Sequence, residues 1–195
     1  MRMIEKKSYT EILDPKRGEE LLQVVRNPFQ QKFTDNVLSF TAWFHDCYYD
    51  PYLGSPVNEL YSNNIFEAMV YPDVNLDSSF DTSTYETVKS SIHATGKHLG
   101  NLSDDASLGV QTLLFMDLDM HGFCDAAEYA RNNVAVAKEY YATSLEEYLP
   151  KRKWFLETLL KKDRIYYLYA DKYEEAARKN IEASIAILNK GLCDF

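Results

Sequence analysis

The residues that could bind a metal ion or move a proton are grouped at a few places in the sequence. The first group is the pair His45-Asp46, which follows the apolar residues Trp43 and Phe44. Adjacent helical side chains point about 100° apart, so an imidazole and a carboxylate here could flank one cation beside the helix. The alternative is a structural pair, in which His45 bonds a backbone carbonyl and Asp46 approaches a helix C-terminus. The pair alone leaves both interpretations open.

A second group of carboxylates, Asp117-Leu118-Asp119, follows the apolar run at 113–116. Within a helix these two carboxylates would point about 200° apart. This predicts one inward ligand and one outward cap or solvent contact, and we favour Asp117 as the inward ligand. His121 follows closely and is a weaker candidate, because its neighbour Gly122 also fits a simple turn.

A third group combines Lys97 and His98, with His93 shortly before them. They offer imidazoles and a cation suited to a phosphate oxygen, although a structural role is the commoner one for such residues. Cys47 adjoins the His45-Asp46 pair and could be a reactive thiol, whereas a buried inert thiol is the more frequent case.

Other common chemistries have no motif in this chain. We find no glycine-rich phosphate-binding loop, no G-x-S-x-G nucleophile motif and no H-E-x-x-H zinc motif. The 3 cysteines are widely spaced and form no C-x-x-C, which predicts neither a disulfide framework nor a zinc knuckle. The expected compartment is therefore a reducing one.

The charge balance excludes several classes of partner. A net charge of −9 argues against bulk nucleic acid and against an anionic membrane surface. A small anionic ligand stays compatible, because a site with its own cation is locally positive. The N-terminus lacks a signal-peptide core and no stretch approaches 18 apolar residues, so we expect a cytoplasmic protein. The oligomeric state stays open, a homodimer included.

These residues must be positioned by helices, since apolar residues recur at spacings of three and four. Val37, Phe40, Trp43 and Phe44 are expected to share one face of a helix over 36–48, and Ser144 with Glu147 predicts a capping box, with Pro150 in the first turn of the helix that follows. The other expected helices span 19–26, 57–70, 84–97, 107–116, 124–142 and 169–189, with a loop over 72–83. The sequence therefore predicts one all-α helical bundle over residues 1–195.

Taken in order, these segments resemble a bacterial-type family of metal-dependent phosphohydrolases of the HD superfamily. The segment 42–50 (AWFHDCYYD) fits the A-W-F-H-D-x-x-Y-D segment of that family throughout. The resemblance covers about residues 20–190. Further matching segments are Asn58-Glu59, Ser62, Ile92 with Thr95 and His98, 115–119, Tyr129-Ala130-Arg131, Arg164-Ile165-Tyr166 and 177–181.

The resemblance implies an HD-type helical fold and a divalent metal held by His45, Asp46 and either Asp117 or Asp119, with Lys97 or His98 contacting phosphate. It also exposes a departure, because residues 1–44 contain no histidine where the family has one upstream of the HD pair. The only substitutes there are amides and a carboxylate: Gln30, Gln31, Asp35 and Asn36. Amide oxygens favour harder ions, so we expect this ligand set to prefer Mg²⁺ and Mn²⁺ over Ni²⁺ and Fe²⁺.

Three functions follow from these observations. The first is a metal-dependent phosphohydrolase acting on a small phosphorylated metabolite or nucleotide. The second is a degenerate HD-type protein that binds a ligand or partner without turnover, as the missing histidine would allow. The third is a helical scaffolding protein in which the HD dipeptide is accidental.

Overall fold

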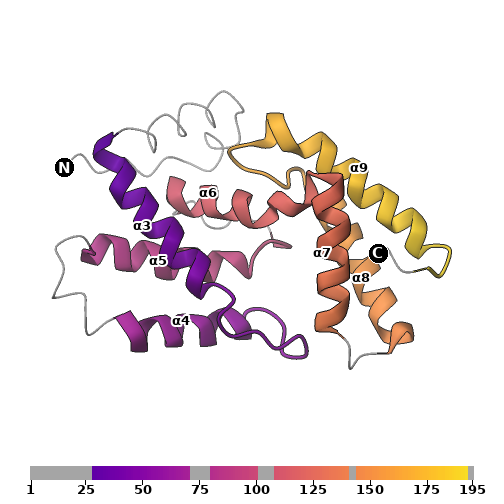
Figure 1. Ribbon diagram of the computed structural model, residues 1–195, viewed down its shortest axis with the longest axis horizontal. Coiled ribbons are helices and arrows are strands. Elements are labelled where there is room, and N and C mark those ends of the chain that lie inside the picture. The colour runs from indigo at the N-terminus through magenta and orange to yellow at the C-terminus, as the bar shows by residue number, and fades with distance from the viewer. Residues whose placement is uncertain (1–27, 71–79, 101–107, 141–143, 193–195) are drawn as a thin grey trace.

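The computed structural model describes residues 28–70, 80–100, 108–140 and 144–192. Within these ranges the regular structure is entirely helical, which confirms the predicted all-α class (Figure 1). No helix in this part of the chain is long and apolar enough to cross a membrane. The expected helix at 19–26 and most of the expected loop at 72–83 lie outside the described residues.

Four helices form the first half of the described fold. They are α3 (Pro28–Phe44), α4 (Val57–Val70), α5 (Thr82–Thr95) and α6 (Val110–Asp119). Helix α5 contacts each of the other three. Its Val88 and Ile92 are fully buried with Val37 of α3 and Phe66 of α4, so these apolar faces hold the helices together.

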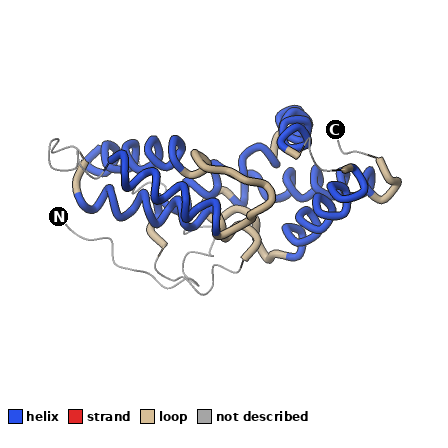
Figure 2. Tube along the Cα trace, turned by 90° about the horizontal axis from the view of Figure 1, so that it is seen from below, coloured by secondary structure: helices blue, strands red, loops and turns tan. Residues whose placement is uncertain are grey.

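The second half continues directly from α6. A short 3₁₀ helix, η2 (Met120–Phe123), is followed by α7 (Ala126–Glu139), α8 (Leu145–Lys161) and α9 (Ala170–Leu188). The core here includes Leu156 and Leu159 of α8 and Ile181 of α9, and the buried Tyr166 hydroxyl donates to the Met120 carbonyl at 2.7 Å. Figure 2 shows the two groups of helices at opposite ends of the elongated molecule.

Two helices lie where the sequence predicted them, whereas the helix expected over 36–48 is α3, which spans Pro28–Phe44 and ends before His45-Asp46. The prediction of 57–70 matches α4, and that of 169–189 matches α9 with its two flanking residues. Trp43 was expected on the buried face of its helix, yet it is 80% exposed. Pro150 was expected in the first helical turn but is the sixth residue of α8, where it removes one backbone hydrogen bond.

The capping residue Ser144 is confirmed, since its hydroxyl accepts from the backbone N–H of Glu147 at 3.3 Å. We expect Ser144→Ala to lower the free energy of unfolding by about 1 kcal/mol, because the Glu147 N–H loses the hydroxyl acceptor and keeps only its contact with the Ser144 carbonyl at 3.0 Å. Urea denaturation followed by circular dichroism measures the loss. Ser144→Asp, which keeps an acceptor, should stay close to the wild type, and equal losses in both variants would contradict the capping role.

Candidate functional site

His45 lies just beyond the C-terminal end of α3 and is held there by the backbone. Its N–H donates to the Thr41 carbonyl at 2.8 Å, and its Nδ1 lies 3.2 Å from the carbonyl oxygens of both Thr41 and Ala42. A carbonyl only accepts, so Nδ1 carries a proton. The structural contact considered from the sequence is therefore present, and it also leaves Nε2 facing away from the backbone, as a metal-binding imidazole requires.

The Nε2 atom of His45 faces two carboxylates. It lies 3.3 Å from Asp46 Oδ2 and 3.4 Å from Asp119 Oδ1. The other oxygen of Asp119 is 2.8 Å from Nε2 of His98, which stands in the turn after α5. Asp119, at the end of α6, thus bridges two imidazoles that come from different parts of the chain.

Two carboxylates that face one imidazole nitrogen require a positive charge at that nitrogen. Burial lowers the pKa of His45, but hydrogen bonds with Asp119 and Asp46, together with their negative charges, outweigh this and raise the pKa to about 10. Burial would raise the pKa of Asp119, yet hydrogen bonds with His45 and His98 and the charges of these imidazoles hold it well below its usual range. A proton on His45 meets the requirement, and so would a metal ion in its place.

Asp117 has a different role from the one favoured above. It points inward and is 2% exposed. Its two oxygens, however, accept the backbone N–H groups of Tyr167, Leu168 and Tyr169 at 2.7–2.9 Å. Burial raises the pKa of Asp117 to about 6, although these three hydrogen bonds act in the opposite direction. Asp117 therefore anchors the segment that leads into α9, and Asp119 is the carboxylate that faces His45.

The imidazole and carboxylate groups around His45 are of the kinds that bind divalent cations, but their arrangement matches a metal site only in part. With metal–ligand distances near 2.1 Å, neighbouring donor atoms lie about 3.0–3.4 Å apart, which both carboxylate contacts of His45 match. Yet the described ranges contain no group of three or more His, Cys, Asp or Glu side chains arranged to hold a metal ion. The contacts are thus pairwise, centred on His45 and on Asp119. Gln31 and Asp35, two of the proposed substitutes, are exposed on α3.

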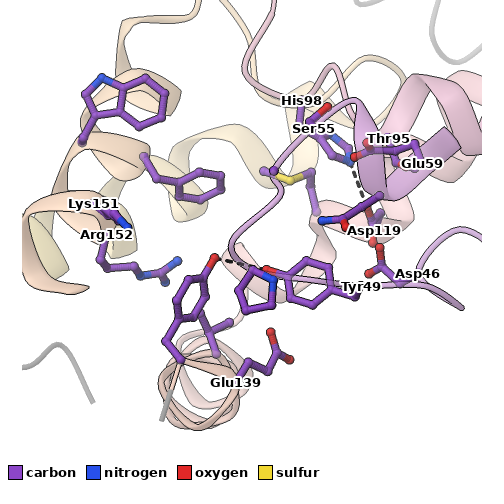
Figure 3. Close-up of a pocket in the computed structure, with 18 of the residues that line it drawn as sticks. Asp46, Tyr49, Ser55, Glu59, Thr95, His98, Asp119, Glu139, Lys151 and Arg152 are labelled. Carbon is purple, nitrogen blue, oxygen red and sulfur yellow. Dashed lines mark hydrogen bonds and ion pairs between the residues drawn. The ribbon is translucent and has the colours of Figure 1, made fainter. Parts of the chain in front are cut away.

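The cluster forms one wall of a pocket of about 590 Å³. Asp46, His98 and Asp119 line it on one side, and Lys151 and Arg152 of α8 line it on the other (Figure 3). Aromatic side chains make up much of the remaining lining: Tyr49, Phe123, Tyr140, Tyr148, Trp154 and Phe155. This volume and mixed lining are typical of sites for small molecules.

Glu59 is a pocket residue that the sequence reasoning did not select as functional. Its Oε2 is buried and has no hydrogen-bond partner among the described residues. A β-carbon at Gly96 would lie 2.8 Å from Glu59 Oε1 and 2.5 Å from Ser55 Oγ, so the absence of a side chain at Gly96 lets Glu59 approach the end of α5. The signal in the sequence was its place in the matching Asn58-Glu59 segment.

The remaining candidates lie apart from this cluster. Lys97 is half-buried in the turn after α5 and does not line the pocket, and His93 is exposed on α5. His121 contacts Glu128 at 3.4 Å and packs its ring edge-on against Tyr173. Cys47 is an exposed thiol beside the Ser62 carbonyl. The structure therefore brings together His45, Asp46, His98 and Asp119 and adds Glu59.

Comparison with known proteins does not extend this description. No protein-family model matches the chain, and no curated protein or solved structure is significantly similar to it.

Proposed function

We propose that this protein is a metal-dependent phosphohydrolase of the HD type, acting on a small phosphorylated metabolite or nucleotide. The observation that carries the proposal is the orientation of His45, whose Nδ1 is committed to backbone carbonyls while Nε2 faces Asp46 and Asp119 at 3.3 and 3.4 Å. These two carboxylates line a pocket large enough for such a substrate. A fixed imidazole opposed by two carboxylates is a donor set suited to a divalent cation.

His45, Asp46 and Asp119 would hold the divalent metal, Mn²⁺, Mg²⁺, Ni²⁺ or Fe²⁺. Three protein ligands leave positions open, which is the usual condition of a catalytic site. When bound, the ion would polarise a phosphoryl oxygen and make hydroxide available near neutral pH. The missing upstream histidine then weakens metal affinity without removing the site.

His98 and Glu59 would act beside the metal ligands. His98 Nε2 lies 2.8 Å from Asp119 Oδ2, so it fixes the orientation of that carboxylate, and as a residue of the pocket lining it would contact a phosphoryl oxygen of the substrate. Glu59 lines the pocket and its buried Oε2 has no partner among the described residues, and we assign this carboxylate to accept the proton of the attacking water. Burial without a partner is costly, and a water or substrate proton would offset the cost.

We expect Glu59→Gln to lower kcat about 100-fold, because the amide cannot accept this proton while its shape is kept. Steady-state assays measure this loss of kcat, and the metal content of each variant is determined in parallel. The matched control is Glu86→Gln, an exposed residue on α5 that is remote from the pocket lining and should leave kcat unchanged. Wild-type turnover by Glu59→Gln would contradict the role of Glu59 as a base.

One finding favours a second candidate, a degenerate HD-type protein that binds a ligand without turnover. The described residues form no closed group of three metal-type ligands, and His45 can be charged by a proton alone. Under this candidate the same pocket binds its ligand and the protein folds without metal.

The test is to purify the protein without chelators, measure bound metals by plasma mass spectrometry, and assay phosphomonoesters and phosphodiesters with each of the four metals added. The phosphohydrolase predicts bound metal and metal-dependent turnover. Absence of both, in a protein that still unfolds cooperatively, would overturn the proposed function and favour the binding protein.

A further inference from the structure

The wall of the pocket opposite the acidic cluster carries two cations, while Glu139 at the end of α7 adds a further carboxylate to the lining. Lys151 and Arg152 are consecutive residues of α8, and Figure 3 shows both on the far side of the pocket from Asp46 and Asp119. Both side chains have partners within the protein, but a ligand whose single phosphate lies at the acidic cluster would present no anionic group to them. The two walls thus differ in the charge that they accept.

Arg152 is held in a defined position although it is charged. Arg152 is only 8% exposed. Its Nη2 donates to Asn133 Oδ1 at 2.6 Å, and its guanidinium lies over the Phe155 ring at 5.7 Å from the centroid. A guanidinium fixed on two sides presents a rigid fork of donors, which matches the geometry of a carboxylate or phosphate. Its position suits binding of an anion and also ties α7 to α8.

Lys151 adds a second cation that is easily redirected. Its ammonium contacts Glu147 at 2.7 Å, but both side chains are more than half exposed, and exposed pairs of this kind contribute little to stability. An incoming anion can therefore share Lys151 at small cost. Because the chain has a net charge of −9, it repels an anionic ligand as a whole, and these two cations offset that repulsion locally.

Between the two walls lie aromatic side chains, and two of them connect separate elements. The Tyr49 hydroxyl, in the segment after His45-Asp46, lies 3.2 Å from that of Tyr140 at the end of α7. Tyr140 in turn packs on Tyr148 with ring centroids 5.6 Å apart. Flat unsaturated groups pack well on such rings.

We propose that Lys151 and Arg152 form a subsite for a second anionic group of the ligand, and that a ring-shaped portion of the ligand lies along the aromatic side chains between the two walls. The substrate class is then an aromatic or ring-containing phosphate with a carboxylate or phosphate at the end remote from the scissile group. The assignment of the phosphate to the acidic wall rests on the proposed function, whereas the anion subsite itself requires only binding.

The test uses probes that differ in one charge. We would compare 4-carboxyphenyl phosphate with 4-carbamoylphenyl phosphate, and repeat the comparison with the longer biphenyl analogues, measuring affinity by calorimetry and kcat/KM with added Mn²⁺. In at least one of the two pairs, we expect the carboxylate probe to bind about tenfold or more tightly than its amide, since it offers a charged hydrogen-bond acceptor. Lys151→Ala should abolish most of this preference.

Two further variants keep the test decisive. Lys153→Ala removes a nearby cation of α8 that pairs with Glu157 and does not line this pocket, so the preference should persist. Arg152→Lys keeps the charge but loses the fork, and should reduce the preference while the protein stays folded. Equal affinity for carboxylate and amide at both lengths, or a preference that survives in Lys151→Ala, overturns the subsite.

The outcomes also separate the two proposals. Turnover of the probes without any preference for the carboxylate leaves the phosphohydrolase in place and overturns the subsite. A Lys151-dependent preference in binding, without turnover under any of the four metals, supports the subsite and overturns the phosphohydrolase. If the probes are neither bound nor hydrolysed, both proposals are overturned.

Discussion

Under the proposed function, replacing His45 with Ala is expected to remove the metal ion and to reduce phosphohydrolase turnover to background. Its Nε2 faces both carboxylates, at 3.3 Å from Asp46 Oδ2 and 3.4 Å from Asp119 Oδ1. Without it two carboxylates remain close to each other with no imidazole between them. Since the loss of residues that merely orient metal ligands costs 10–100-fold, loss of a ligand should exceed about 100-fold.

The measurement is plasma mass spectrometry on wild type and variant purified in parallel, together with kcat/KM at saturating metal. His93→Ala is the matched control, because His93 is an exposed imidazole on α5 outside the pocket lining. Metal content and turnover should be unchanged in that variant. If His45→Ala kept its metal and its activity, neither the metal site nor the proposed function would stand.

Replacing Asp117 with Ala is expected to produce the largest loss of stability. Its carboxylate accepts three backbone N–H groups at 2.7–2.9 Å, and two of these hydrogen bonds are buried. Each buried donor left without an acceptor costs about 1–3 kcal/mol, so we expect a loss of about 3–5 kcal/mol. For a chain of this size the melting temperature should fall by about 10 °C.

Thermal and urea denaturation measure this loss. Asp117→Asn keeps the shape and one acceptor oxygen, and should lose about half as much. Asp171→Ala, which removes an exposed carboxylate from the first turn of α9, should cost less than about 1 kcal/mol. A variant Asp117→Ala with wild-type stability would show that the segment before α9 does not depend on this anchor.

The local pattern of residues predicted α4 and α9 closely and α3 poorly, since the helix expected over 36–48 spans Pro28–Phe44. Apolar spacing placed α4 and α9 almost at their observed bounds, and the Ser144–Glu147 spacing located the start of α8. Both signals act within a few residues, because helix periodicity and capping depend on neighbouring positions. Periodicity failed where burial depends on what packs against a helix, as at Trp43, which is exposed although its spacing fits the apolar face.

The sequence by itself determined the helical class and the chemistry available at His45-Asp46 and at the two aspartates of 117–119. Only the tertiary structure decided which aspartate meets the histidine. Asp117 and Asp119 are equivalent by composition and close in sequence, but one faces the backbone of 167–169 and the other faces His45 and His98. Likewise, Glu59 of α4 and Lys151 and Arg152 of α8 line the same pocket as Asp46 and Asp119 although they are distant in sequence, and no local pattern encodes that proximity.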